Sequence, residues 1–268
     1  MKDTNVNRLK NYEELEFKDD FMFGKVMENK ALCREVLECL LQYPIGELTD
    51  IQSQREFRYT QDGKKIRLDI YTRDENTIYD AEMQNRDHKT LESLELPKRT
   101  RYYQSLLDMD HIEKAQSYRW LPNSEIIFIC TFDPFEEGLP FYSFKNICHE
   151  NNKIHLEDGT SKRFFNCTYK GLDINENLRR FYNYVMTGKA EGRLTKRLNR
   201  EVIKARNNEK WRSEFMKEQV LLMDIREEGI KEGISREREN TLKMKEKLDK
   251  AEDYIKELEE KLSAFNKQ

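Results

Sequence analysis

Residues 65–84, KIRLDIYTRDENTIYDAEMQ, decide the fold, because two strand patterns flank a short polar turn. Residues 65–72 alternate with a period of two, which places Ile66, Leu68 and Ile70 on one face and Arg67, Asp69 and Tyr71 on the other. Residues 73–76 are polar and suit a hairpin turn, and residues 77–84 read as a second strand. The stretch therefore predicts a β-hairpin.

The hairpin carries two acids that pairing would bring together. Asp69 and Glu82 lie on the two strands, so their carboxylates can converge within a few ångströms, and Gln84 leaves the same face as Glu82. Two carboxylates at that separation repel each other unless a cation lies between them, and oxygen ligands favour Mg²⁺ or Mn²⁺. The pattern is typical of a metal-dependent phosphodiesterase; two solvated acids on a half-exposed hairpin are the alternative.

The surrounding segments predict an α/β fold. Residues 17–41 have the apolar spacing of an amphipathic helix, possibly two, that ends before Tyr43 and Pro44. Residues 90–111 read as helix, with Pro97 able to start a new one, and residues 125–132 form an apolar run that suits a buried strand. The expected order is helix, hairpin, helix and strand.

Composition limits the class of protein. The 268 residues include 48 Lys plus Arg and 51 Asp plus Glu, a net charge of −3, which excludes a globally basic protein that wraps nucleic acid. Charged residues make up 37%, above the usual value of about 25%, so part of the chain should be a solvated helix. The chain contains neither a G-x-x-x-x-G-K-[ST] loop nor a G-x-G-x-x-G motif, which argues against an NTPase or a dinucleotide enzyme.

The sequence predicts a cytoplasmic protein without a membrane segment. Its apolar runs are far shorter than the roughly 20 residues that a membrane helix needs. The N-terminus has no apolar stretch of the kind found in signal peptides. The five cysteines are an odd number without a C-x-x-C pair, which suits a reducing compartment.

Changes in composition divide the chain into an N-terminal extension (1–14), a folded domain (15–172), a helical region (173–235) and a coiled coil (236–268). The last segment has apolar residues spaced alternately by four and three, as in the a/d seam of a coiled coil. These residues are Met244, Leu248, Ala251, Ile255, Leu258, Leu262 and Phe265. We expect a homodimer through this seam; a single helix that folds back onto its own domain is the alternative.

Five segments together resemble the PD-(D/E)XK nuclease superfamily, and within it the family of putative transposases also called recombination-promoting nucleases (Rpn). They are DFMFGKVM (20–27), RLDIY (67–71), AEMQ (81–84), KRTRYYQS (98–105) and IFICTFDPF (127–135). The resemblance covers roughly residues 15–172. It implies a restriction-endonuclease-like core, in which helices flank a mixed central sheet, and a metal-dependent DNA endonuclease that acts in recombination or on mobile elements.

The resemblance also implies roles for individual residues. Asp69 and Glu82 become the ligands of Mg²⁺ or Mn²⁺, and Gln84 takes the place of the superfamily's lysine, which orients the nucleophilic water. A carboxamide can hold a water by hydrogen bonds, although it brings no positive charge. Asp20 matches the family's N-terminal signature and is our preferred helix acid.

Other observations leave alternatives open. Glu28 and Glu35 are further candidates for the helix acid, and Gly24 stands where the family usually has lysine. That departure and the missing lysine at Gln84 favour a second hypothesis, a catalytically idle domain that binds DNA or serves as a scaffold. RNA as the substrate is a third hypothesis, because phosphate chemistry alone does not distinguish the two polymers.

Cations and aromatic rings alternate on the predicted helix that follows the hairpin. Arg99, Tyr102 and Tyr103, together with Arg67 on the first strand, suit contacts with the phosphates and bases of DNA. We expect Arg99 to face the site and Tyr103 to be partly buried. In the structural alternative, one tyrosine of the adjacent pair belongs to the core and the other to its rim.

Overall fold

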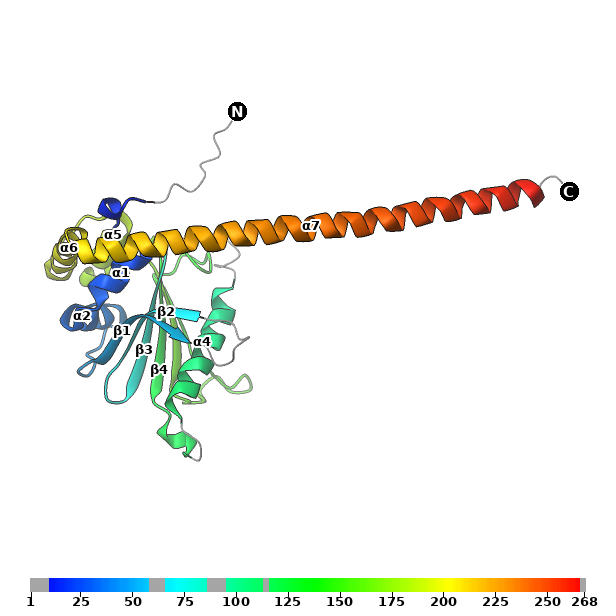
Figure 1. The fold of residues 1–268 in the computed structure, drawn as a ribbon. Helices are drawn as coiled ribbons and strands as arrows, with labels where there is room; N and C mark the ends of the chain where they lie inside the picture. Colours follow the sequence, from blue (N-terminus) through cyan, green and yellow to red (C-terminus); the bar gives the residue numbers. More distant parts are fainter. Residues whose placement is uncertain (1–9, 58–65, 86–94, 113–115, 266–268) are drawn as a thin grey trace. The chain divides into compact units, whose positions relative to one another are not determined.

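The computed structural model describes residues 10–57, 66–85, 95–112 and 116–265 (Figure 1). The chain divides into two units, residues 1–211 and residues 212–268, and the first contains a six-stranded mixed sheet. The strands are β1 (Thr49–Phe57), β2 (Ile66–Arg73), β3 (Thr77–Gln84), β4 (Asn123–Cys130), β5 (Phe141–Phe144) and β6 (Thr160–Asn166).

Helices flank this sheet on both faces (Figure 1). The α-helices are α1 (Asp20–Met27), α2 (Lys30–Leu41), α4 (Leu96–His111), α5 (Glu176–Thr187), α6 (Arg193–Arg206) and α7 (Glu209–Phe265). Two short 3₁₀ helices are η1 (Tyr12–Glu14) and η2 (Tyr118–Trp120). Helix α4 covers one face of the sheet, and α1, α2, α5 and α6 gather on the other (Figure 1).

The strands follow the order β1-β2-β3-β4-β6-β5. β1, β2 and β3 are antiparallel neighbours, β3, β4 and β6 are parallel, and β5 returns antiparallel on the edge. Because β3 and β4 are parallel, the chain must cross over between them, and α4 lies in that crossover. This arrangement is the mixed sheet flanked by helices that the sequence predicts.

The predicted hairpin is present as β2 and β3, but more of it is buried than the alternation suggests. Ile70 and Thr72 are fully buried, and Tyr71, expected on the polar face, is 2% exposed. The Tyr71 hydroxyl lies 2.7 Å from Nε2 of His111, the last residue of α4. Tyr71 therefore shares one core cluster with Ile66 and Leu68, which the alternation placed on the opposite face, and residues of α4 belong to the same cluster.

Strand β4 is the apolar run in the middle of the sheet. Residues 126–130 are all fully buried, as expected of a strand that is covered on both faces. Phe128 stacks between Tyr103 of α4 and Phe164 of β6, with ring centroids 6.4 and 5.3 Å away. This aromatic layer fixes α4 against the sheet and so determines where the side chains of the helix point.

The sequence did not predict β1, β5 or β6. In β1 only Phe57 is buried, and the strand carries glutamine, serine and glutamate rather than alternating apolar residues. β1 and β5 are the edge strands of the sheet, where one side has no neighbour to bury. Partial burial leaves little periodicity in the sequence, which is why the pattern missed β1 and β5. β6 lies inside the sheet, but its burial does not alternate strictly along the strand.

The N-terminal helical stretch consists of two helices rather than one. The side chain of Asn29 accepts a hydrogen bond of 3.2 Å from Leu32 N–H and caps α2, so the break follows from a capping residue. Upstream, the Tyr12 hydroxyl donates a 2.6 Å hydrogen bond to the carbonyl of Ala205 in α6. Of the predicted extension, residues 1–9 lie outside the described residues, as do residues 90–94 of the predicted helix after the hairpin.

Helix α7 is continuous from Glu209 to Phe265 and passes through the predicted boundary at residue 235. Several residues of the predicted seam are well exposed: Met244 (72%), Leu248 (58%), Ile255 (54%) and Leu258 (44%). Of the helices in the described residues, none is long and apolar enough to cross a membrane.

Candidate active site

The candidate site lies where β2 and β3 stop pairing. The described register of this antiparallel pair runs from Arg73↔Ile78 to Ile70↔Ala81. One residue further on, backbone N–H groups bond to side chains instead of to the opposite backbone. The Asp69 N–H donates a 2.9 Å hydrogen bond to Oε1 of Glu82, and the Met83 N–H donates a 2.9 Å hydrogen bond to Oδ2 of Asp69. Satisfying these backbone donors holds both carboxylates in the gap between the two strands.

Arg99 of α4 reaches the same place from above the sheet. Its Nη2 lies 3.1 Å from Oε2 of Glu82, and its Nη1 donates 3.2 Å to Oε1 of Gln84. Its Nε and Nη2 also donate to the Tyr103 hydroxyl, at 3.2 and 2.7 Å. Arg99 therefore contacts both polar residues at the end of β3, and the structure brings Asp69, Glu82, Gln84 and Arg99 together.

The electrostatics of the site are dominated by an excess of negative charge. Burial, and then the charges of Glu82 and Asp20, raise the pKa of Asp69 well above its usual 3.8. Burial and the charge of Asp80 likewise raise the pKa of Glu82, although Arg99 opposes that shift. Carboxylates that raise one another's pKa favour a proton or a cation between them.

Asp80 is a member of this group that the sequence analysis did not identify. It is fully buried on β3, where its carboxyl group lies close enough to that of Glu82 for the two to share a proton in a hydrogen bond. Burial and the charge of Asp69 raise its pKa well above 3.8. The signal was available in the sequence, because Asp80, Glu82 and Gln84 alternate along one face of the strand.

Among the candidate helix acids, Asp20 is the one whose charge is felt by the carboxylate pair. It is the first residue of α1, and its charge raises the pKa of both Asp69 and Glu82. The preceding residue, Asp19, accepts a 3.4 Å hydrogen bond from the side chain of Asn85, which follows β3 directly. The N-terminus of α1 thus lies at the same end of the sheet as the carboxylate pair.

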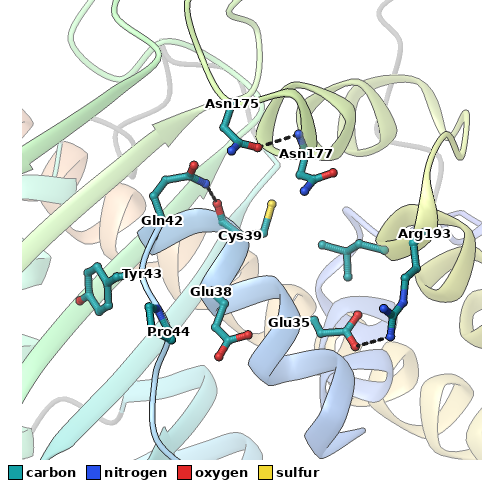
Figure 2. Close-up of a pocket in the computed structure, with 10 residues that line it drawn as sticks. Glu35, Glu38, Cys39, Gln42, Tyr43, Pro44, Asn175, Asn177 and Arg193 are labelled. Carbon is teal, nitrogen blue, oxygen red and sulfur yellow. Dashed lines mark hydrogen bonds and ion pairs between the residues drawn. The ribbon is translucent and has the colours of Figure 1, made fainter.

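The two other candidate helix acids have different partners. Glu28 accepts a 2.5 Å hydrogen bond from the hydroxyl of Ser53 on β1. Glu35 pairs with Arg197 and lies 4.0 Å from Arg193, both on α6. Figure 2 shows Glu35 with Arg193 beside a hollow lined by residues of α2, α5 and α6. Glu28 thus bonds to an edge strand and Glu35 to α6, and both contacts lie away from the carboxylate pair Asp69 and Glu82.

The predicted substrate-binding residues differ in how accessible they are. Tyr102 is 40% exposed, and Arg67 is exposed and lowers the pKa of Asp69 through its charge. Tyr103, which we expected to contact DNA, is only 5% exposed and stacks on Phe128. The ring of Tyr103 therefore belongs to the core, and its hydroxyl accepts hydrogen bonds that hold Arg99 in place.

The donor chemistry of this site fits Mg²⁺ or Mn²⁺. Asp69 and Glu82 offer carboxylate oxygens and Gln84 offers a carboxamide oxygen, the ligands that these ions prefer. Within the described part of the chain, no three His, Cys, Asp or Glu side chains are grouped closely enough to hold an ion together. Mg²⁺ is usually held by one or two carboxylates, with waters and substrate phosphates as further ligands, so Asp69 and Glu82 meet that requirement.

Comparisons with known proteins place the chain in a family. Residues 14–261 match the family model described as PD-(D/E)XK nuclease family transposase. No curated protein and no solved structure gives a significant match.

Proposed function

The chain belongs to the PD-(D/E)XK nuclease family transposases, and from this premise we propose that it is a metal-dependent endonuclease that hydrolyses phosphodiester bonds in DNA. The observation that carries the proposal is the carboxylate pair Asp69 and Glu82, held in the gap between β2 and β3. A third carboxylate, Asp20, acts on both members of the pair.

In the proposed mechanism Asp69 and Glu82 would hold Mg²⁺ or Mn²⁺, and the ion would supply Lewis-acid polarisation of the scissile phosphate. The carboxamide of Gln84 positions the attacking water by hydrogen bonds. Arg99 donates to a phosphate oxygen and stabilises the charge that develops there. The oxygen of the water forms the new P–O bond while the bond from phosphorus to the leaving oxygen breaks; the water releases one proton to solvent, and the leaving oxygen takes up one proton from solvent.

Arg99 also answers the main objection to activity, which is the missing lysine at position 84. The carboxamide of Gln84 is neutral, but the guanidinium of Arg99 lies 3.2 Å from its oxygen. A positive charge therefore stands next to the position where the superfamily has its lysine, although another element contributes it. This arrangement favours the nuclease over the catalytically idle alternative.

Supercoiled-plasmid cleavage tests the proposal. With Mg²⁺ or Mn²⁺ the protein should nick or linearise the plasmid, and Asp69→Asn and Glu82→Gln should each lower the rate by about 10³-fold or more, since each removes a charged ligand. Glu125→Gln is the matched control: Glu125 is also buried and paired with an arginine, but lies near the start of β4. It should cut like the parent.

The absence of metal-dependent cleavage would overturn the nuclease assignment and leave the idle DNA-binding or scaffold protein. Cleavage of a matched RNA but not of the plasmid would overturn DNA as the substrate.

We also propose that α7 joins two copies of the chain. Upstream of Met244 the same phase falls on Met216, Val220, Met223, Ile230 and Ile234, which are between 46 and 55% exposed, and is interrupted by Glu227, Glu237 and Thr241. A coiled coil in which a second copy covers this face buries these side chains. Two sites in one dimer would allow both strands of a duplex to be cut.

Light scattering coupled to size exclusion tests this association. The double variant Leu248→Lys/Ile255→Lys places charges at two seam positions and should halve the molar mass of a dimer. Leu242→Lys is the control, because Leu242 is an equally exposed apolar residue (63%) of α7 that lies outside the seam. A parent chain that is already monomeric, or a double variant with the parent's mass, would contradict the dimer.

A further inference from the structure

Arg99 occupies the position that a cation needs. Its Nη2 lies 3.1 Å from Oε2 of Glu82, and its Nη1 lies 3.2 Å from Oε1 of Gln84. The second oxygen of Glu82 accepts the N–H of Asp69 at 2.9 Å. Oε1 of Glu82 is engaged by a backbone N–H, and Oε2 and the Gln84 oxygen are engaged by Arg99, so a metal ion that approaches Oε2 competes with the guanidinium for the same side of the carboxylate.

The guanidinium of Arg99 also contacts Tyr103 and Phe128, and these contacts form a second anchor that can remain when its bond to Glu82 breaks. Its Nε and Nη2 donate to the Tyr103 hydroxyl, and its centre lies 5.3 and 5.4 Å from the ring centroids of Tyr103 and Phe128. Both rings are at most 5% exposed, so this anchor is rigid. The Arg99 side chain itself is 23% exposed and can be reached by a phosphate.

The charge around Arg99 makes its place suitable for a metal ion. Asp69, Asp80 and Asp20 act on the contact through their charges, and Asp80 is fully buried. If Arg99 turns to another anion, these carboxylates lose the cation that bonds Glu82, and Arg67 acts only on Asp69 through its charge. A divalent cation is the group that would then balance them.

We propose that Arg99 is a resident substitute for the metal, which closes the site until a DNA phosphate draws the guanidinium away from Glu82. This inference rests on the proposed function and adds an order of events to it. Metal and DNA then bind cooperatively, because each favours the state in which Arg99 has left Glu82. By linkage, the metal tightens DNA binding by the same factor as DNA tightens metal binding.

Binding of Mn²⁺ to the free protein, measured by calorimetry, tests the substitution directly. Arg99→Gln should bind Mn²⁺ about tenfold more tightly than the parent, because nothing has to be displaced from Glu82. Arg67→Gln removes the same charge near Asp69 but leaves the Arg99 contact, and it should change the affinity less than about threefold. Unchanged or weaker binding in Arg99→Gln, equal tightening in both variants, or no binding in any of them would overturn the proposal.

Cooperativity gives an independent readout. Ca²⁺ should tighten the binding of a fluorescent duplex to the parent, measured by anisotropy, and this factor should be about fivefold smaller in Arg99→Gln. Equal factors in the two proteins would overturn the proposal. If Arg99→Gln does not fold, Arg99→Lys replaces it, because one ammonium group cannot hold Glu82 and Gln84 as the guanidinium fork does.

These measurements separate the inference from the proposed function. Tighter Mn²⁺ binding by Arg99→Gln without plasmid cleavage by the parent supports the substitution and contradicts the nuclease. Cleavage by the parent with unchanged Mn²⁺ binding in the variant contradicts the substitution alone.

Discussion

The two ends of the sheet each carry a buried glutamate held by one arginine and accompanied by one tyrosine. At one end Arg99 lies 3.1 Å from Glu82 and bonds the Tyr103 hydroxyl. At the other, Arg163 lies 3.0 Å from Glu125, and the Tyr43 hydroxyl donates 3.1 Å to the same glutamate. Each arginine also lies over its tyrosine ring, at 5.3 and 5.7 Å.

The surroundings of the two groups differ. The pKa of Glu82 is raised by burial and by its neighbours Asp80 and Asp20, and its strand diverges from β2. Glu125 lies within the regular ladder, where it pairs with Tyr79 of β3 and Ser161 of β6. An arginine–glutamate pair is thus a structural element in a continuous sheet, and becomes a candidate for chemistry where strands separate and further carboxylates gather.

Replacing Arg163 and Arg99 in turn tests whether the two arginine–glutamate pairs differ. We expect these replacements to have the largest effects on stability. Arg163→Met leaves Glu125 buried without its cation and should lower the free energy of unfolding by about 3 kcal/mol, with or without Mg²⁺. Arg99→Met should also destabilise, but millimolar Mg²⁺ should restore part of the loss, because the ion replaces the missing cation.

Urea unfolding followed by the fluorescence of Trp120 and Trp211 measures both effects. If Mg²⁺ stabilises the two variants equally, the ends of the sheet do not differ in the way proposed.

Asp133 is a carboxylate near the same end of the sheet as Glu82, and replacing it should have a smaller effect on stability than replacing either arginine. Asp133 follows β4, and although burial raises its pKa, hydrogen bonds from the Tyr142 hydroxyl and the N–H groups of Gly138, Phe135 and Glu136 hold it below 3.8. At neutral pH, Asp133→Ala should therefore cost about 2 kcal/mol.

The pH dependence has a defined sign. A carboxyl whose pKa is lowered in the folded state contributes stability above its unfolded value of 3.8 and loses it as the pH falls through the folded value. The difference between parent and Asp133→Ala should therefore shrink below about pH 4. Asp133→Asn keeps an acceptor without a charge and should show a smaller loss; a constant loss down to pH 3 in Asp133→Ala would contradict the assigned cause.

Much of the fold could be read from local patterns. Alternation with period two predicted the hairpin at its observed position, with the second strand ending at Gln84, and the apolar run predicted β4 within two residues at each end. The edge strands were missed because their sequences carry little periodicity. Tyr71 was placed on the face with Arg67 and Asp69, and its burial was missed because a strand pattern contains no information about which side chains a helix will cover.

The site itself was only partly predictable. Pairing in a hairpin was enough to bring Asp69 and Glu82 together, because residues thirteen apart on two adjacent strands meet across the ladder. Asp80 was overlooked because its burial depends on α4. The choice among Asp20, Glu28 and Glu35 needed the structure, because each acid finds its partners on a different element.

By itself, then, the sequence determined the hairpin and its two acids, the buried central strand and the apolar seam of α7, since each depends on spacings of two, three or four residues along one element. Only the tertiary structure decided that the pairing of β2 with β3 ends at Asp69, that Asp80 is buried, and that Arg99 stands against Glu82. The physical reason is that these features depend on how α4 packs on the aromatic layer of the sheet, and packing between distant segments leaves no period in the chain.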